Sequence, residues 1–511
     1  MVFELNKESD VPLYTQIERR MTELIRVGIL KADEKLPATR DLALQLHVHR
    51  NTVVQAYQEL EVKGFVYSEV GRGTFVSKHA HVAAKGTVAA QNKSGNFSFD
   101  GLYAEHWINP EDPSMQAIDT IVRTCSKPQD MIAFSSVVPD KHFFPLVDFQ
   151  NCSYRAIQKY GVDLLEMGDT QGFRPFVEYL PKFLVRRGLT VQSSDITMVS
   201  GIQQGIDLIA RILINPGDTV ITEEVTYHGA RRIFKSLGAN IIGIPMDDQG
   251  MRMDILETIL ARQKVKMIYT IPTFQNPTGR TMPLDRRKHL LELAYHYEIP
   301  IVEDQYANEL RMEGEEIVPI AALDDEGIVI ALGSFSKILF HGIRLGWVIT
   351  SNRAFQNKLN YAKRLTDWQN NYLIQGAILE FCEAGHFDRY LKRKMKVVKE
   401  RRDAMITASR QYFPEEVRFH VPAGGLFEWA DLPDGMDEYD VLMEARQRRV
   451  LFTPKRFFSV RPDAGGGMRL GFVSQTTEHI HEGIAILGDI IKKKIGSAPW
   501  VESDSALASV M

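Results

Sequence analysis

From about Met131 onward, short apolar runs alternate along the chain with longer amphipathic stretches. This alternation predicts strands and helices in turn, which is the pattern of an α/β fold with a mostly parallel sheet. Polar residues recur where the apolar runs end, and open α/β sheets bind their ligands beyond the carboxyl ends of the strands. The pattern therefore predicts both a fold class and the edge of the sheet at which a site lies.

The residues that end these runs form one candidate site. In chain order its members are Gly201, Ile202, Gln203, Tyr227, Asn276, Asp304, Tyr306, Ser334, Ser336, Lys337 and Arg344. Taken singly, each has an ordinary explanation, such as a turn for Asn276 or a helix cap for Asp304. Together they predict a ligand with a phosphate, an aromatic ring that needs an acidic partner, and a carbonyl that accepts an amine. Pyridoxal 5′-phosphate has all three.

Lys337 lies in the segment GSFSK, which directly follows the apolar run GIVIAL. Three explanations compete for it: a solvated loop lysine, the lysine of an S-x-x-K acyl-enzyme motif with Ser334, and a lysine that forms a Schiff base. The acyl-enzyme motif needs S-D-N and K-T-G partners, and neither occurs in this chain. The predicted site therefore makes Lys337 the catalytic residue, bonded to the cofactor as the internal aldimine.

The remaining candidates are expected to surround the cofactor. Asp304 pairs with the pyridinium nitrogen, and Tyr227 stacks on the ring. Asn276 and Tyr306 hydrogen-bond the phenolic oxygen. The phosphate is expected at a helix start, where free backbone amides favour an anion. The residues expected to hold it are Gly201, Ile202, Gln203, Ser334, Ser336 and Arg344.

The first 77 residues have a different pattern. Three amphipathic segments, beginning near Leu13, Thr39 and His49, precede two alternating strands around Gly71-Arg72-Gly73. This is the layout of a winged helix-turn-helix, and the alternative is a small helical interaction domain with a charged rim. The formal net charge of −4 gives no global sign of nucleic-acid binding, so the prediction depends on local residues. The candidates for DNA contact are Lys35, Arg40, His49, Arg50, Asn51, Thr52, Arg72 and Gly73.

Length and composition set the expected organisation, because 511 residues exceed a single core. We expect a winged helix-turn-helix domain at 1–77, a linker and lead-in at 78–111, an effector and dimerisation domain at 112–495, and a flexible tail at 496–511. Three unevenly spaced cysteines argue against a disulfide framework or a metal site. The chain begins without a leader-like segment and has no run of the roughly 18 apolar residues that span a bilayer, so the expected location is cytoplasmic.

Two resemblances sharpen these predictions. The stretch LPATRDLALQLHVHRNTVVQAYQELEVKGFVYSEVGRGTFV resembles the DNA-binding domain of the GntR group of bacterial regulators. Arg40, Arg50, Thr52 and Gly73 stand at its characteristic positions, and a departure is His49, where the family usually has serine at the helix cap. The segments SGIQQG, EEVTYHGA, FQNPTG, EDQY, GSFSK and GIRLGW resemble, in order and spacing, those of fold-type I aminotransferases of the aspartate aminotransferase class.

The second resemblance spans about residues 112–495 and adds one residue to the site. The segment GGGMRLGFVS is similar to the carboxylate-binding segment of that class. The resemblance implies that Arg469 grips an α-carboxylate with both guanidinium arms, and a purely structural arginine is the alternative.

Taken as a whole, the chain resembles MocR-type regulators, in which a GntR-like domain is fused to an aminotransferase-like domain. The resemblance implies double-stranded operator DNA as a partner and a homodimer, with a domain swap as one arrangement. One hypothesis is a transcriptional regulator that senses an amino acid or other amine by aldimine exchange on pyridoxal 5′-phosphate. The second is an active aminotransferase with an extra domain, and a cofactor-free dimerisation domain is a third. We favour the regulator, because a DNA-binding module has little use on a metabolic enzyme.

Overall fold

The computed structural model describes residues 5, 11–26, 30–69, 72–77, 131–138, 143–461 and 465–497. The chain divides into two compact units, Met1–Tyr103 and Ala104–Met511. The linker and lead-in predicted at 78–111 lie outside the described residues, and so does the predicted tail beyond Ser497.

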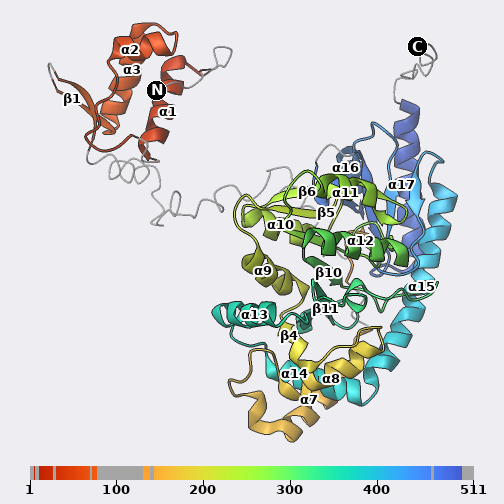
Figure 1. The fold of residues 1–511 in the computed structure, drawn as a ribbon. Coiled ribbons are helices and arrows are strands. Elements are labelled where there is room, and N and C mark those ends of the chain that lie inside the picture. The colour runs from red at the N-terminus through yellow and green to blue at the C-terminus, as the bar shows by residue number, and fades with distance from the viewer. Residues whose placement is uncertain are drawn as a thin grey trace. The chain divides into compact units, whose positions relative to one another are not determined.

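The first unit is a small helical domain with a β-hairpin (Figure 1). Its elements are α1 (Leu13–Arg26), α2 (Thr39–Gln45), α3 (Arg50–Val62), β1 (Val66–Glu69) and β2 (Gly73–Val76). Ile17 and Met21 of α1 share a core with Val53 and Leu60 of α3, because apolar residues at helical spacing form one face of each helix. The two strands pair antiparallel. The predicted winged helix-turn-helix is confirmed.

The second unit is built on a seven-stranded sheet with the order β4-β12-β11-β10-β9-β5-β6. Only β12 runs against its neighbours within this sheet, so the sheet is mostly parallel, as predicted. The strands β10 and β11 lie side by side and bring Asp304 and the segment of Lys337 to the same edge. The seven strands of the sheet are β4 (Ile196–Val199), β5 (Thr219–Glu223), β6 (Asn240–Ile244), β9 (Met267–Thr270), β10 (Ile301–Gln305), β11 (Val329–Ser334) and β12 (Gly346–Ile349).

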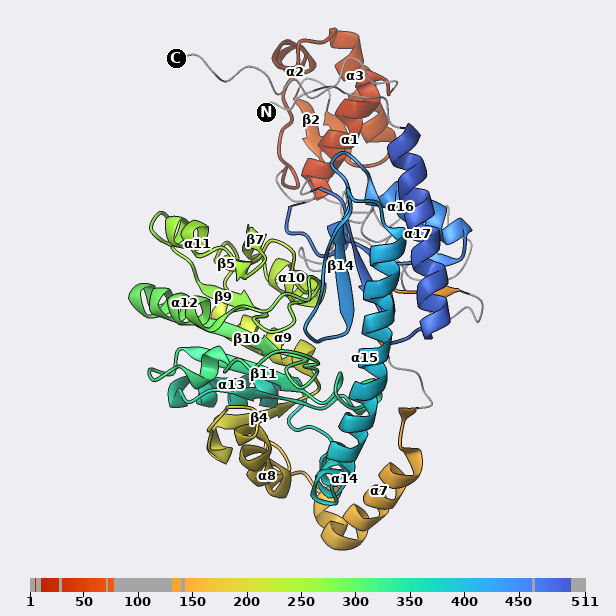
Figure 2. The ribbon, with the colours of Figure 1, turned by 90° about the vertical axis from the view of Figure 1, so that its right-hand side faces the viewer.

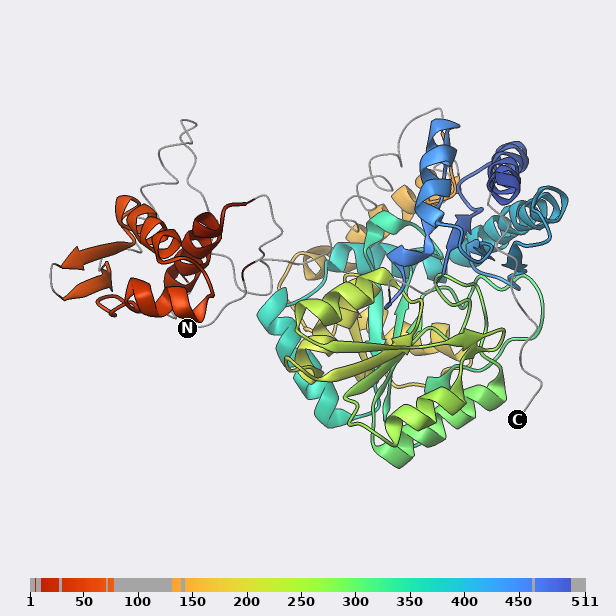
Figure 3. The ribbon, with the colours of Figure 1, turned by 90° about the horizontal axis from the view of Figure 1, so that it is seen from above.

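Helices cover both faces of this sheet (Figure 3). Side chains alternate across a strand, so neighbouring residues such as Val220 and Ile221, or Met267 and Ile268, enter two different cores. Burial on both faces explains why these strands are continuous apolar runs in the sequence. The helices of this part of the chain are α8 (Arg174–Val185), α9 (Ile202–Leu213), α10 (His228–Ser236), α11 (Met253–Leu260), α12 (Leu284–Tyr297) and α13 (Arg353–Thr366), and α7 (Leu146–Tyr160) packs against α14 (Tyr372–Glu383).

A smaller four-stranded antiparallel sheet, with the order β13-β14-β17-β16, forms the C-terminal part of this unit. Its strands are β13 (Arg418–His420), β14 (Phe427–Asp431), β16 (Thr453–Pro454) and β17 (Gly467–Gly471). The long helix α15 (His386–Tyr412) contacts α14 and packs beside α17 (Thr477–Ser497), as Figure 2 shows. The remaining elements are α16 (Glu438–Gln447), β3 (Ile132–Ala133) paired with β15 (Val450–Leu451), and β7 (Met246–Asp247) paired with β8 (Gly250–Met251).

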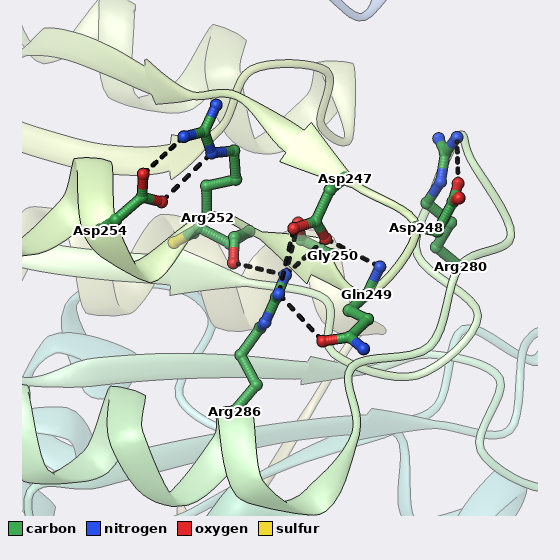
Figure 4. A network of polar contacts seen from close by, with 9 residues as sticks. Asp247, Asp248, Gln249, Gly250, Arg252, Asp254, Arg280 and Arg286 are labelled. Carbon is green, nitrogen blue, oxygen red and sulfur yellow. Dashed lines mark hydrogen bonds and ion pairs between the residues drawn. The ribbon is translucent and has the colours of Figure 1, made fainter.

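Charged side chains of the β7–β8 hairpin form ion pairs with neighbouring elements (Figure 4). Asp247 accepts from both arms of Arg286 in α12, at 2.5 and 3.0 Å. Asp248 pairs at 3.3 Å with Arg280, which comes directly after the turn Asn276–Gly279. These pairs connect the hairpin both to a helix and to the loop that carries Asn276. Among the described helices, none is long and apolar enough to cross a membrane.

Candidate functional site

A cavity of about 240 Å³ lies at the carboxyl ends of the parallel strands of the second unit. The residues predicted to bind the cofactor or a ligand carboxylate line this cavity, except Gly201. Ile202, the residue after Gly201, is part of the lining. The predicted residues in the lining are Ile202, Gln203, Tyr227, Asn276, Asp304, Tyr306, Ser334, Ser336, Lys337, Arg344 and Arg469. Residues that are far apart in sequence therefore converge on one space.

Lys337 lies in the turn that follows β11, and its amine is poised for nucleophilic chemistry. Burial, followed in importance by the positive charges of Arg469, Lys394 and Arg344, lowers the pKa of Lys337 to about 7. Its Nζ lies 2.7 Å from Nε2 of His341. A lysine with such a pKa is partly neutral near pH 7, and only the neutral amine attacks a carbonyl.

Asp304 lies near the end of β10 with its carboxylate buried beneath the cavity. Oδ2 accepts a hydrogen bond of 2.6 Å from the hydroxyl of Tyr269, whereas Oδ1 is buried and has no hydrogen-bond partner among the described residues. Burial raises the pKa of Asp304 to about 7, against the opposing effect of the Tyr269 hydrogen bond. An unpartnered buried carboxylate oxygen favours a cationic donor in the cavity, because such a donor would offset the cost of burying the charge.

Asp304→Asn is expected to change how the stability of the cofactor-free protein depends on pH. The folded-state pKa near 7 exceeds the ordinary 3.8, so between these values the folded protein keeps a proton that the unfolded chain has lost. The stability that this proton contributes is present below pH 4 and is lost as the pH rises through 7. Asparagine does not titrate, so the variant gains stability relative to the parent, on the order of a few kcal/mol between pH 4 and 8.

Thermal unfolding of the parent and the Asp304→Asn variant across that pH range measures this difference. The two melting temperatures should separate as the pH rises. Melting temperatures that stay a constant interval apart from pH 4 to 8 would contradict the raised pKa of Asp304.

Several hydrogen-bond donors gather at the start of α9. Gly201 has φ of +83°, and a Cβ there would lie 2.8 Å from Nη2 of Arg344. Glycine therefore allows Arg344 to lie against the first amides of the helix, where its Nη2 donates to the Ser200 carbonyl at 2.8 Å. The Oγ of Ser336 is buried without a hydrogen-bond partner, and Ser334 donates to the Leu345 carbonyl at 3.1 Å. Helix amides, an arginine and an unpartnered hydroxyl are the donors that a phosphate needs.

Two tyrosines and an asparagine border the same cavity. The hydroxyl of Tyr227 donates to Oε1 of Gln203 at 2.7 Å, and burial raises the pKa of Tyr227 to about 12. The hydroxyl of Tyr306 donates to the backbone carbonyl of Phe274 at 2.7 Å, which leaves its oxygen able to accept. Asn276 accepts from Arg469 through its side-chain oxygen at 3.1 Å. The predicted hydrogen-bonding groups are thus held in place by protein contacts.

Arg469 is a buried guanidinium on β17, opposite Trp429 and Thr453 in the small sheet. It is flanked by the rings of Phe427 and Phe458, whose centroids lie 5.0 and 4.8 Å away. Burial lowers the pKa of Arg469 to about 10, so the side chain stays charged at neutral pH. Within the described residues no carboxylate forms an ion pair with it, and its Nε has no hydrogen-bond partner. A buried, uncompensated cation favours an anionic ligand.

Three functional neighbours were not anticipated from the sequence. His341 lines the cavity and contacts Lys337, and Tyr269 holds Asp304. Lys394 of α15 donates to the backbone carbonyl of Lys337 at 2.5 Å, and burial lowers the pKa of Lys394 to about 7. His341 follows Lys337 by four residues, a spacing that signals contact only when the local turn is known. Predicting the role of Tyr269 requires the strand order, and predicting the role of Lys394 requires the course of α15.

The predicted DNA contacts lie in the first unit, around the start of α3. Nδ1 of His49 accepts a hydrogen bond of 3.3 Å from the backbone amide of Asn51, so this histidine caps the helix as serine would. Arg50 and Asn51 are exposed in the first turn, and Thr52 is half-buried. Nε of Arg50 lies 3.5 Å from Oγ1 of Thr39, which connects the starts of the two short helices.

The hairpin and the segment before α2 carry the other predicted DNA contacts. Arg72 pairs with Glu69 at 2.6 Å, so its charge is partly balanced within the hairpin. Gly73 has φ of +118°, and a Cβ there would lie 2.9 Å from Cε of Lys35. Glycine therefore leaves room for the Lys35 stem along the strand. Arg40 is exposed on α2.

Comparison with known proteins gives matches for both units. The family described as aminotransferase class I and II matches residues 150–487, and the family described as bacterial regulatory proteins, gntR family, matches residues 13–76. Aromatic-amino-acid aminotransferase 1 of Thermococcus litoralis is 39% identical over 403 residues, which cover 78% of this chain and 95% of the relative. The probable rhizopine catabolism regulatory protein MocR of Rhizobium meliloti is 27% identical over 486 residues, and the match covers 94% of both chains.

A solved structure shows the same fold. The multiple substrate aminotransferase from Thermococcus profundus superposes with a TM-score of 0.74 at 35% identity, covering 79% of this chain and 100% of that one. The chain belongs to the aminotransferase class I and II family, whose members generally use pyridoxal 5′-phosphate. It joins that domain to a gntR-family helix-turn-helix domain, which implies DNA binding. The predicted MocR-type architecture is confirmed.

Proposed function

We propose that this protein is a transcriptional regulator that binds operator DNA through its first unit and senses an amino acid or other amine through its second. The observation that carries the proposal is a single cavity with three complementary groups. They are the Lys337 amine with its lowered pKa, the unpartnered oxygen of Asp304, and the buried charge of Arg469. Because a gntR-family domain is on the same chain, binding of an amine at the sensing site could change DNA binding.

The side chains of the cavity fit pyridoxal 5′-phosphate. Oδ1 of Asp304, buried and unpartnered, suits the protonated ring nitrogen. The start of α9, the guanidinium of Arg344 and the unpartnered Oγ of Ser336 suit the phosphate. Tyr227 borders the space that an aromatic ring would occupy.

When bound, pyridoxal 5′-phosphate supplies a carbonyl that condenses with amines and a ring that acts as an electron sink. Lys337 would provide the amine that holds the cofactor, and its amine would be free when another amine occupied the carbonyl. Asp304, fixed by the hydrogen bond from Tyr269, would favour a proton on the ring nitrogen. Arg469 orients a carboxylate by presenting its two arms in a fixed plane.

The second candidate is an active aminotransferase that carries a DNA-binding domain. Its support is the presence of Lys337, Asp304 and Arg469 in one cavity, together with 39% identity to an aromatic-amino-acid aminotransferase. A sensor needs only a differential affinity of about 1–3 kcal/mol between two arrangements to give a measurable response. An enzyme must in addition remove the α-proton and release keto acid at useful rates.

Selection of operator DNA with the purified full-length protein, followed by a screen of amines, tests the proposal. We expect a yellow protein whose colour borohydride fixes on Lys337. We also expect an amine that shifts the cofactor spectrum and the DNA affinity together, with little keto acid formed. Failure to bind added cofactor would contradict the proposed site. Turnover around the median enzymatic rate, near 10 per second, with DNA binding indifferent to amines would instead support the enzyme.

Arg50→Ala is expected to weaken operator binding by about 1–3 kcal/mol, because arginines in the first turn of a recognition helix contact base edges or phosphates. Arg40→Ala should act similarly from α2. Arg19→Ala is the matched control, since Arg19 is an exposed arginine on α1 and its loss removes the same charge. Gel-shift titrations on one operator at one salt concentration measure the three variants. Normal binding by both the Arg40 and the Arg50 variants would show that the assigned recognition helix is wrong.

The proposed homodimer predicts two copies of the DNA-binding unit per assembly. Footprinting should therefore reveal paired half-sites, in direct or inverted orientation. Sedimentation of the full-length protein measures the assembly independently. A monomer that protects a single half-site would contradict the dimer.

A further inference from the structure

The Lys337 amine has a neighbour that the proposed function does not use. Nζ of Lys337 lies 2.7 Å from Nε2 of His341, which follows it by four residues and lines the same cavity. The other ring nitrogen of His341, Nδ1, is buried and has no hydrogen-bond partner in the part of the chain that the structure describes. Among the described residues, the ring of His341 therefore has one polar contact, and that contact is with the reactive amine.

The charges around this pair keep the ring neutral. Burial, together with the smaller effects of the positive charges on Lys337, Lys394 and Arg344, lowers the pKa of His341 to about 3. Lys337 faces Arg469, Lys394 and Arg344, and the other titratable groups that line the cavity are Asp304, Tyr227, Tyr306 and His228. A neutral imidazole keeps a lone pair on one nitrogen. Because an ammonium group can only donate, Nε2 of His341 accepts whenever Lys337 is protonated.

We propose that His341 is a positioning residue that holds the Lys337 amine after an incoming amine has taken its place on the cofactor carbonyl. This inference rests on the proposed function. In the exchange, the incoming nitrogen forms a bond to the carbonyl carbon, and the bond from that carbon to Nζ of Lys337 breaks. Two hydrogens leave the incoming nitrogen and two arrive on Nζ, so the step needs no oxidant or reductant.

The contact with His341 stabilises only one side of this exchange. Nζ has its free hydrogens and its full reach to the ring only when it is not bonded to the cofactor. An interaction that exists in one of two states shifts the equilibrium toward that state. His341 therefore raises the affinity of the loaded protein for amines, and it does so without touching the amine that binds.

Titration of the cofactor-loaded, full-length protein with methylamine tests the inference. Methylamine has no carboxylate, so Arg469 contributes nothing specific to its binding, and the cofactor absorbance reports the exchange directly. His341→Leu should raise the apparent Kd for methylamine by roughly two- to tenfold, the range of one hydrogen bond. His341→Gln, whose amide can accept or donate, should stay within about twofold of the parent.

A second measurement uses the cofactor-free protein and stands even when a variant loads poorly. The rate at which acetic anhydride modifies Lys337, followed by mass spectrometry across pH, gives the pKa of its amine. Loss of the ring acceptor removes a partner of the charged form, so His341→Leu should lower the pKa of Lys337 further, and His341→Gln should restore it. Similar melting temperatures show that the fold is intact.

Two results would overturn the inference. One is an unchanged methylamine Kd or an unchanged Lys337 pKa in His341→Leu. The other is His341→Gln behaving like His341→Leu, which would indicate that the ring acts only by its shape. Because the methylamine titration involves no DNA, either result leaves the proposed DNA response to be judged separately. A parent protein in which no amine displaces Lys337 would instead contradict the proposed function itself.

Discussion

Lys337→Ala should abolish every effect of amines on operator binding. The proposed signal starts when an amine takes the place of Lys337 on the cofactor, and alanine has no amine to displace. The first unit has its own hydrophobic core, so binding to the operator without amine should persist. Cofactor that enters the variant should be removable by dialysis, because the covalent bond is absent. Fluorescence anisotropy on labelled operator, with and without the active amine, measures the loss.

Lys358→Ala is the matched control for this variant. Lys358 is an exposed lysine on α13, so its removal changes the net charge equally and leaves the cavity intact. The control should respond to the amine as the parent does. An amine that still shifted operator binding of Lys337→Ala by the parental amount would rule out displacement of this lysine as the signal.

The sequence predicted the fold well where burial dictates the pattern. Strands such as β9 and β10 are buried on both faces, so they appear in the sequence as apolar runs of the right length. Asp304 and Lys337 belong to two such strands and their following turns, and the rule that ligands bind at the carboxyl edge was enough to group them. The strand order itself, with β12 antiparallel between β4 and β11, is not carried by any local pattern.

Side chains that act through a neighbour were harder to predict. Tyr269 holds Asp304 only because β9 lies beside β10, and Lys394 reaches the Lys337 carbonyl because α15 passes beneath that turn. Neither residue belongs to a short motif. The sequence placed His49 at the helix-cap position but did not predict its capping hydrogen bond, because histidine is an uncommon cap and its ring nitrogen accepts from Asn51 only in the observed conformation. Local periodicity determines elements, whereas such contacts depend on packing between elements.

Of the residues in the cavity, Arg469 gives the most specific indication of the chemistry of the ligand. Arg469 is 8% exposed as a residue, and its guanidinium lies against Phe427 and Phe458 and has no acidic partner among the described residues. Its hydrogen bonds go to neutral oxygens of Asn276, Ser135 and Thr453, at 3.1 to 3.4 Å. Neutral acceptors provide hydrogen bonds to the guanidinium, but they do not balance its positive charge. A carboxylate in the cavity would supply the missing anion.

Arg469→Ala should therefore weaken the binding of amino acids by about 3–5 kcal/mol, or roughly two to four orders of magnitude, because the carboxylate would lose its buried partner. The test compares the amino acid that most shifts the cofactor spectrum with the amine that lacks only its carboxylate, such as L-alanine with ethylamine. The parent should favour the amino acid, and Arg469→Ala should lose that preference while still exchanging the simple amine. Arg469→Lys should lie between them, because lysine keeps the charge but not the two-armed geometry. An equal loss of affinity for both ligands would mean that Arg469 supports the structure of the cavity and does not bind the carboxylate.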